Sequence, residues 1–317
     1  MKTLNEQINE VLASKKSKSA KRADLIKLGL CNLDVAVLFK LNKELVDANT
    51  PAARVREVRN TLAQIIKKYT FGVEIECFNA PCSTLIDAAR DNGLLIQSES
   101  YNHRDNRRYY KLVPDASIRG ENPIECVSPI LKGNSRGFNS LKSCCTALNQ
   151  IGAMVNKSTG LHVHIGGGIT ESQYVNTFAN YFYLESVIDT FMAASRRDAY
   201  YASALAHTNQ RRNVDVSELL HACTFADVFN AMHGDRYYKI NCCSWQRHST
   251  IEFRQHSGTT NYEKIQMWAT FCLKLVAWSA ENRLTNFVSS IDDIPFLTAA
   301  EKRYFKQRAT ALAGADE

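Results

Sequence analysis

The sequence has 317 residues, of which 45% are hydrophobic and 22% are charged. A chain of this length can bury a substantial core, and its 14 glycines and 6 prolines exclude collagen-like and low-complexity classes. No window approaches the roughly 18 consecutive apolar residues of a membrane span, and the polar first 22 residues lack the apolar stretch of a signal peptide. We therefore expect a soluble, cytoplasmic, globular protein that does not contact membranes.

The net charge of +7 is confined to the beginning of the chain. Residues 1–68 contain ten lysines and four arginines against seven acidic residues, whereas residues 69–317 contain 25 residues of each sign. This asymmetry predicts a basic N-terminal module (1–68) attached to a neutral main domain (69–317). The ten cysteines show no CxxC pair and no zinc-finger spacing, so their pattern does not indicate a disulfide framework.

Helical segments are predicted in the N-terminal module at 3–13, 22–30, 32–41 and 51–69. Gly29 suits a helix C-terminus and Asn32 suits the N-cap of the next helix, which gives this pair a helix-turn-helix rhythm. Two interpretations remain open. The module either contacts nucleic acid or forms a small helical bundle whose basic surface faces solvent.

From Tyr69 onward, short strands are interspersed with helices. Strands are predicted at 71–78, 109–113, 122–131, 153–167 and 249–258, and helices at 135–152, 170–206, 216–233, 262–282 and 298–313. Because the strands are not joined by regular single-helix crossovers, we predict a mixed α+β fold with antiparallel strands.

Three of these strands carry ionisable residues at positions i and i+2, which point to the same face of a strand. The pairs are Glu74 with Glu76, His162 with His164, and Glu252 with Arg254. Any one pair also fits a strand whose polar face meets water. If the three strands adjoin, however, their polar faces merge into one patch, whose carboxylates repel one another unless a cation compensates.

Such a patch suits a divalent metal together with phosphate, because carboxylates and imidazole hold the metal while arginine binds phosphate oxygens. Glu125, in the strand predicted at 122–131, is a further candidate ligand, with an ordinary surface carboxylate as the alternative. Asp115 and Ser117 lie just before that strand.

Five motifs follow one another in the main domain: GVEIE (72–76), DxS (115–117), ExxSP (125–129), GxHVHxG (160–166) and IEFRxHxGT (251–259). In this order they resemble the amidoligase family of carboxylate–amine ligases, which is related to glutamine synthetase and glutamate–cysteine ligase. The segments 195–201 and 237–243 are also similar to the family's pattern. The resemblance covers about residues 70–280, and the combination of motifs is specific where each one alone is not.

The resemblance implies a glutamine-synthetase-like fold, in which a twisted antiparallel sheet flanked by helices forms an open funnel with ATP at one end. It implies Mg²⁺ or Mn²⁺ ions held by Glu74, Glu76, Glu125, His162 and Glu252. The residues near ATP or its phosphates would be His164, Arg254, Lys239 and Asn241. The catalytic residues would be Arg254, Glu76 and Glu252.

The reaction implied is ATP-dependent formation of an amide or peptide bond. ATP converts a carboxylate into an acyl phosphate, a neutral amine then attacks it, and ADP and phosphate are released. The candidates for binding the substrate carboxylate are Arg196, Arg197, Arg211 and Arg212, with a solvated surface as the alternative. The identity of the carboxylate and amine substrates (small molecule, peptide or protein) does not follow from the resemblance.

Two other classes of protein remain as alternatives. A zinc-dependent hydrolase would use the HxH pair and a glutamate, although the additional carboxylates and Arg254 favour hard metals and phosphate. A nucleic-acid-binding regulator with an inactive ligase-like domain would account for the basic N-terminus. A decayed site, however, would be expected to lose some of the acidic residues, histidines or arginine that this chain retains.

Overall fold

The computed structural model describes residues 7, 10–12, 14, 16–28, 66–100, 102, 108–205 and 213–314. The chain divides into two compact units, Met1–Ala63 and Gln64–Glu317. In the first unit, helix α2 (Lys18–Lys27) buries Leu25 fully, and its Asp24 pairs with Lys16 at 2.7 Å (Oδ2 to Nζ). The turn predicted at Gly29, the helix predicted at 32–41 and residues 51–65 of the helix predicted at 51–69 lie outside the described residues. Nucleic-acid binding by this module stays a prediction.

The second unit is built on a sheet with the strand order β2-β3-β4-β1-β6-β8-β7, in which β5 pairs with one end of β1. The strands are β1 (Thr70–Cys77), β2 (Ile96–Ser98), β3 (Tyr110–Val113), β4 (Ile124–Val127), β5 (Leu131–Lys132), β6 (Gly160–Gly166), β7 (Ile240–Asn241) and β8 (Ile251–Ser257). Among these, β2 and β3 pair in parallel and the other pairs are antiparallel. The predicted mixed α+β fold with mostly antiparallel strands is confirmed, whereas the glutamine-synthetase-like funnel stays a prediction.

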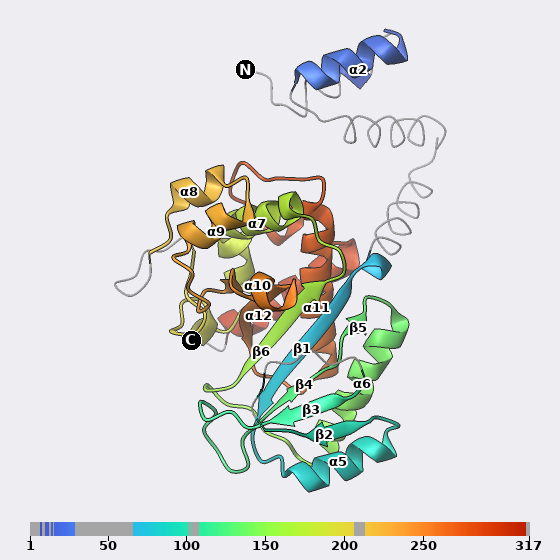
Figure 1. The fold of residues 1–317 in the computed structure, drawn as a ribbon, viewed down its shortest axis with the longest axis vertical. Coiled ribbons are helices and arrows are strands. Elements are labelled where there is room, and N and C mark those ends of the chain that lie inside the picture. The colour runs from blue at the N-terminus through green and yellow to red at the C-terminus, as the bar shows by residue number, and fades with distance from the viewer. Residues whose placement is uncertain are drawn as a thin grey trace. The chain divides into compact units, whose positions relative to one another are not determined.

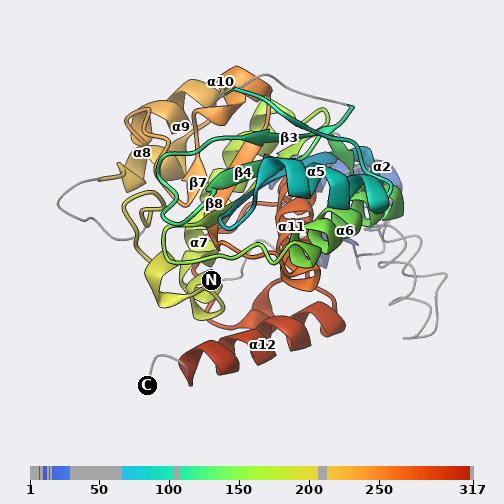
Figure 2. The same ribbon diagram turned by 90° about the horizontal axis from the view of Figure 1, so that it is seen from below.

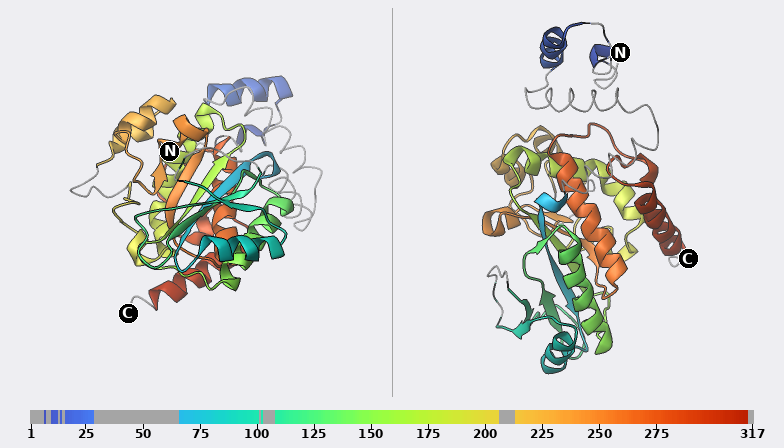
Figure 3. Two further views of the ribbon diagram at one scale, coloured as in Figure 1. Left: turned by 60° about the horizontal axis from the view of Figure 1, so that its bottom comes forward. Right: turned by 90° about the vertical axis from the view of Figure 1, so that its right-hand side faces the viewer.

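Long helices cover one face of this sheet (Figure 1). The helices of the second unit are α5 (Cys82–Asp91), α6 (Ser135–Gln150), α7 (Glu171–Thr190), α8 (Val216–His221), α9 (Phe225–Ala231), α10 (Ser244–His248), α11 (Tyr262–Ser279) and α12 (Ala299–Ala313). Helix α11 lies against β6 and contacts both α6 and α7. Figures 2 and 3 show these three helices on one side of the sheet and α12 farther out.

The apolar side chains of the strands point into this helical layer. Val73 and Ile75 of β1, Val163 of β6 and Phe253 of β8 are all buried, and Phe253 packs edge-on against Trp268 of α11 with 6.4 Å between ring centroids. Because successive side chains of a strand alternate between its faces, this burial turns the intervening polar residues to the opposite side. The fold therefore presents the predicted polar pairs on the face away from the helices.

Side-chain caps begin the long helices close to where the sequence predicts them. Asn134, Thr170 and Asn261 each accept a hydrogen bond from a first-turn backbone N–H, of α6, α7 and α11 respectively. Among the described residues, no helix combines the length and the apolar character that crossing a lipid bilayer requires.

Two predicted helices differ from the structure. The helix predicted at 170–206 ends at Thr190, where Arg197 folds back and donates from Nε to the carbonyls of Asp189 and Met192. Such a contact satisfies carbonyls that lack partners at a helix C-terminus. The single helix predicted at 216–233 is divided into α8 and α9, because Thr224 forms a capping box that begins a new helix.

Candidate active site

The strands that carry the predicted polar residues are neighbours in the sheet, in the order β4-β1-β6-β8-β7. Their register places Glu125 opposite Glu76, Glu74 opposite His162, and Glu252 opposite both His164 and Asn241. Residues directly opposite each other on antiparallel strands face the same side. Five strands therefore contribute to one polar cluster on the face that the helices leave open.

This cluster forms the floor of a cavity of about 1420 Å³. Its walls come from segments 115–119, 156–158 and 166–168 beside the strands, from segment 195–201 after α7, and from residues 247–250 at the end of α10 and just after it. Pockets for one small molecule usually measure about 300–1,000 Å³. The cavity therefore has room for more than one substrate.

Three overlapping groups of side chains each bring their ligand atoms within 4.8 Å of one another. The groups are Glu74 with His164 and Glu252, Glu74 with Glu125 and His162, and Glu76 with Asp115 and Glu125. Because Glu74 and Glu125 each belong to two groups, these seven residues form one continuous arrangement, which we call the carboxylate array. None of the three groups contains two histidines, and such oxygen-rich donor sets suit Mg²⁺ or Mn²⁺ better than zinc.

His162 lies at the centre of the carboxylate array. Its Nδ1 is 2.9 Å from Glu74 Oε2, and its Nε2 is 3.5 Å from Glu76 Oε1. The other oxygen of Glu76 accepts a hydrogen bond from the backbone N–H of Gly160 at 2.6 Å. The side chain of Glu76 is therefore fixed by the first residue of β6.

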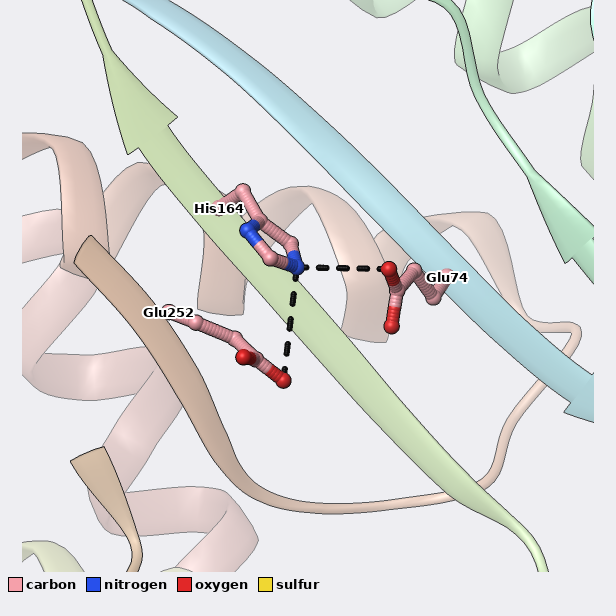
Figure 4. A group of neighbouring side chains, drawn as sticks. All are labelled: Glu74, His164 and Glu252. Carbon is pink, nitrogen blue, oxygen red and sulfur yellow. Dashed lines mark ion pairs between the residues drawn. The ribbon is translucent and has the colours of Figure 1, made fainter. Parts of the chain in front are cut away.

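His164 presents a buried nitrogen to two carboxylates (Figure 4). Its Nε2 lies 3.3 Å from Glu74 Oε1 and 4.0 Å from Glu252 Oε1, yet it makes no hydrogen bond. Its Nδ1 lies 3.0 Å from the hydroxyl of Thr250, which orients the ring. A buried nitrogen that faces carboxylates while the other ring nitrogen is held by a hydrogen bond fits a metal ligand. His164, predicted as a nucleotide contact, is thus also a candidate ligand.

Glu252 is held at both of its oxygens. Oε1 accepts a hydrogen bond from Arg254 Nη1 at 2.5 Å, and Oε2 accepts one from Asn241 Nδ2 at 2.5 Å. The guanidinium of Arg254 also donates from Nε to the carbonyl of Tyr201 at 3.4 Å. Arg254 is thus fixed between the array and the cavity wall, and Asn241 orients Glu252.

The charges of the array shift the pKa values of its members. Burial would lower the pKa of His164, but the carboxylates of Glu252 and Glu74 raise it to about 9. Burial would raise the pKa of Glu252, but Arg254 and His164 lower it to about 2. For Glu125, burial and the neighbouring glutamates act together and raise its pKa well above the usual value. Glu125 therefore keeps a proton to a higher pH than an ordinary carboxyl group.

Lys239, which is predicted to lie near the nucleotide, contacts helix α7. Its side chain is fully buried and does not line the cavity. Its Nζ lies 2.8 Å from Asp189 Oδ1 and 3.3 Å from Glu185 Oε1, both on α7. Strand β7 begins only at Ile240, so the alternation that turns Asn241 to the cavity does not extend back to Lys239.

The four candidate arginines have different places. Arg196 lines the cavity, is only 7% exposed, and donates from Nη2 to the carbonyl of Thr159. Arg197 instead caps the end of α7. Arg211 and Arg212 lie outside the described residues. Of the four, Arg196 is the one that the described structure places where a substrate could meet it.

Asp115 joins the array without having been predicted as a ligand. It lies in the loop between β3 and β4, where its Oδ1 accepts a hydrogen bond from the N–H of Ser117 at 2.7 Å. The signal in the sequence was the DxS motif. A loop residue has no strand alternation from which its direction can be deduced, so its role as a ligand candidate comes from the structure.

A family model described as "Putative amidoligase enzyme" matches residues 67–276, about two thirds of the chain. The chain belongs to the amidoligase family. The matched part of this amidoligase begins just before β1, ends within α11, and includes every member of the carboxylate array. The family assignment confirms the resemblance of the motifs and indicates a ligase-type enzyme. No curated protein matches the sequence.

Proposed function

We propose that this amidoligase is an ATP- and Mg²⁺-dependent carboxylate–amine ligase that forms an amide or peptide bond through an acyl phosphate. The observation that carries the proposal is the carboxylate array itself, five carboxylates and two imidazoles beside Arg254 on the floor of one cavity. Oxygen-rich sites of this kind bind divalent cations together with the phosphates of a nucleotide.

The side chains at this site have different proposed roles, which follow from their chemistry. The carboxylates of Glu74, Glu76, Glu125 and Glu252, together with the two histidines, would hold divalent cations, which when bound offset the charge on the phosphate oxygens of ATP. Arg254, held by Glu252, would stabilise the charge that spreads over the oxygens of the transferring phosphoryl group. Because Arg254 is already fixed before any substrate arrives, little reorganisation is required during the reaction.

The proposed reaction has two steps. A carboxylate oxygen of the substrate attacks the γ-phosphorus of ATP, and the bond between that phosphorus and ADP breaks. The nitrogen of a neutral amine then attacks the acyl carbon, the bond from that carbon to the phosphate oxygen breaks, and the nitrogen loses a proton. The products are an amide, ADP and phosphate.

The test uses hydroxylamine in place of the unidentified amine. The full chain is incubated with ATP, Mg²⁺, hydroxylamine and a mixture of amino acids and peptides, and hydroxamate, ADP and AMP are measured. We expect equal amounts of hydroxamate and ADP. Glu76→Ala and Arg254→Ala should abolish both products while the proteins remain folded, whereas Arg303→Ala, at an exposed position of α12, should retain activity.

Two results would contradict the proposal. AMP in place of ADP would indicate an acyl adenylate rather than an acyl phosphate. Activity that survives both Glu76→Ala and Arg254→Ala would show that the chemistry occurs elsewhere.

A further inference from the structure

Three tyrosines form an aromatic surface at the edge of the cavity, which we call the tyrosine platform. Tyr200 and Tyr201 are 52% and 49% exposed, and their ring centroids lie 4.7 Å apart. Tyr237 completes the platform at 5.3 Å from Tyr201 and 6.1 Å from Tyr200. The guanidinium of Arg236 lies 5.0 Å from the ring centroid of Tyr237. All four residues line the cavity.

Tyr200 and Tyr201 lie at the tip of a tight backbone turn. Ala199 and Ala202 hydrogen-bond to each other in both directions, at 3.3 and 3.1 Å, so Tyr200 and Tyr201 are the two central residues of a tight turn. The N–H of Ser203 donates to the carbonyl of Tyr237 at 2.8 Å, which ties the turn to the third tyrosine. Turns of this length favour Gly, Asn and Asp at their tips. The turn itself therefore gives no reason for two large aromatic side chains.

The platform is connected directly to the reacting centre. The carbonyl of Tyr201 accepts the hydrogen bond from Arg254 Nε, and Arg254 in turn holds Glu252 of the carboxylate array. Arg196, five residues before Tyr201, is a second buried guanidinium in the same wall. A molecule lying across the tyrosines would thus extend toward two arginines, which are the residues best suited to bind a carboxylate.

We propose that the tyrosine platform binds a peptide whose carboxylate group extends toward Arg254 and Arg196, so that the carboxylate substrate is a peptide rather than a free amino acid. The inference rests on the proposed ligase function. Tyrosine and arginine are the side chains that most often carry the binding energy of polypeptide surfaces. The platform lies at the partly exposed edge of the cavity, where a bound chain can continue outside it. Because Tyr200 and Tyr201 are about half exposed, a chain that extends beyond the arginines would lie against their rings.

The test measures binding and does not depend on turnover. Two pools of pentapeptides are labelled with fluorescein at the N-terminus and are random elsewhere, without Asp or Glu. The Glu pool carries a central Glu and a free C-terminal carboxylate, whereas the Gln pool carries a central Gln and an amidated C-terminus. Binding to the full chain is followed by fluorescence anisotropy in Mg²⁺. We expect the Glu pool to bind about tenfold more tightly than the Gln pool. The double variant Tyr200→Ala/Tyr201→Ala should lose about tenfold or more in affinity for the Glu pool, as expected for truncated aromatic anchors.

Matched variants separate recognition from general effects. Tyr200→Phe/Tyr201→Phe keeps the rings and should bind nearly as the wild type does. Phe287→Ala removes an aromatic residue that is 58% exposed but does not line the cavity, and should change nothing. Thermal unfolding of each variant verifies that it is folded.

The proposal is overturned if the Glu and Gln pools bind alike, if neither pool binds, or if the double alanine variant binds as the wild type does. Tyrosine-dependent binding of a labelled oligonucleotide without binding of peptide would also overturn it. The outcome is independent of the ligase test. Tyrosine-dependent peptide binding without hydroxamate formation would support the platform and reject the ligase. Hydroxamate formation with peptide binding that does not depend on the tyrosines would support the ligase and reject the platform.

Discussion

Binding of a divalent cation at the carboxylate array should release a proton from His164. In the metal-free protein, burial would lower the pKa of this imidazole, but Glu252 and Glu74 raise it to about 9. A group with that pKa is about 97% protonated at pH 7.5 and about half protonated at pH 9. A histidine must be neutral to coordinate a metal. A cation that enters the group with Glu74 and Glu252 should therefore release close to one proton at pH 7.5, and about half a proton at pH 9.

Protons and the cation compete for His164, and this competition sets how the affinity for the cation depends on pH. Because protons compete with the cation below the pKa of His164, the apparent association constant contributed by this site should rise about tenfold per pH unit up to about pH 9 and level off above it. Calorimetric titration with Mn²⁺ under argon, in two buffers of different ionisation enthalpy, measures both the affinity and the number of protons released.

A variant isolates the contribution of His164. Glu125, whose pKa is raised by burial and by neighbouring carboxylates, can also release a proton when a cation binds, but it does so in both proteins. The wild type should therefore release about one proton more than His164→Gln at pH 7.5, whereas His221→Gln on α8 should match the wild type. Equal proton release by wild type and His164→Gln, or an affinity that does not change between pH 7 and pH 9, would refute the reasoning.

Three further predictions concern stability. The pKa of His256 is lowered to about 3 by burial and by Arg308, so its contribution to stability is complete above the ordinary pKa of 6.5 and is lost as pH falls toward 3. At pH 5 the loss is about 2 kcal/mol, or roughly 4–8 °C in Tm, and the difference in Tm between wild type and His256→Gln should follow it. An unchanged difference between pH 8 and pH 5 would contradict the assignment. Lys239→Met leaves the buried carboxylate of Glu185 and the partly buried carboxylate of Asp189 without this cation and should cost about 3–5 kcal/mol in urea unfolding. Lys306→Met, at an exposed ion pair, should have little effect on the free energy of unfolding. Equal losses of unfolding free energy in Lys239→Met and Lys306→Met would show that burial of the Lys239 ion pairs does not increase their contribution to stability. In Gly258→Ala the added Cβ would lie 2.1 Å from Thr159 Oγ1 and should cost about 1–3 kcal/mol, whereas Gly72→Ala meets nothing closer than 3.7 Å. A Tm for Gly258→Ala equal to that of Gly72→Ala would exclude the clash.

The sequence was sufficient to predict which residues of each strand share a face. Glu74 and Glu76 alternate with the buried Val73 and Ile75, and this spacing alone separates the cavity side from the helix side. The register between strands could not be predicted in this way, because it depends on which strands become neighbours and on how the intervening chain connects them. The pairing of Glu76 with Glu125, which brings two carboxylates together, could be recognised only in the structure.

A bulge in β8 shows where simple alternation fails. The ladder with β6 passes from Leu161 opposite His256 to Val163 opposite Phe253, so β8 contains one more residue than β6 at this point. Strict alternation from Arg254 would turn His256 to the cavity, but His256 is buried 6.0 Å from the ring of Trp268. No periodicity in the sequence indicates such an insertion.

Residues supplied by loops were equally beyond prediction from periodicity. Asp115 and the tyrosine platform reach the cavity from segments without regular structure, and Lys239 precedes its strand by one residue. For these positions the direction of the side chain is set by local hydrogen bonds, such as the one between Asp115 and Ser117, rather than by a repeating pattern.

The turn at 199–202 is closed by hydrogen bonds between backbone atoms of Ala199 and Ala202, and Arg254 contacts it through a backbone carbonyl. None of these contacts depends on the side chains at positions 200 and 201. The backbone hydrogen bonds that close the turn and hold Arg254 therefore do not require a particular side chain at either tip position. A library randomised at these two positions would therefore vary the tyrosine platform while the backbone contacts of the turn are kept.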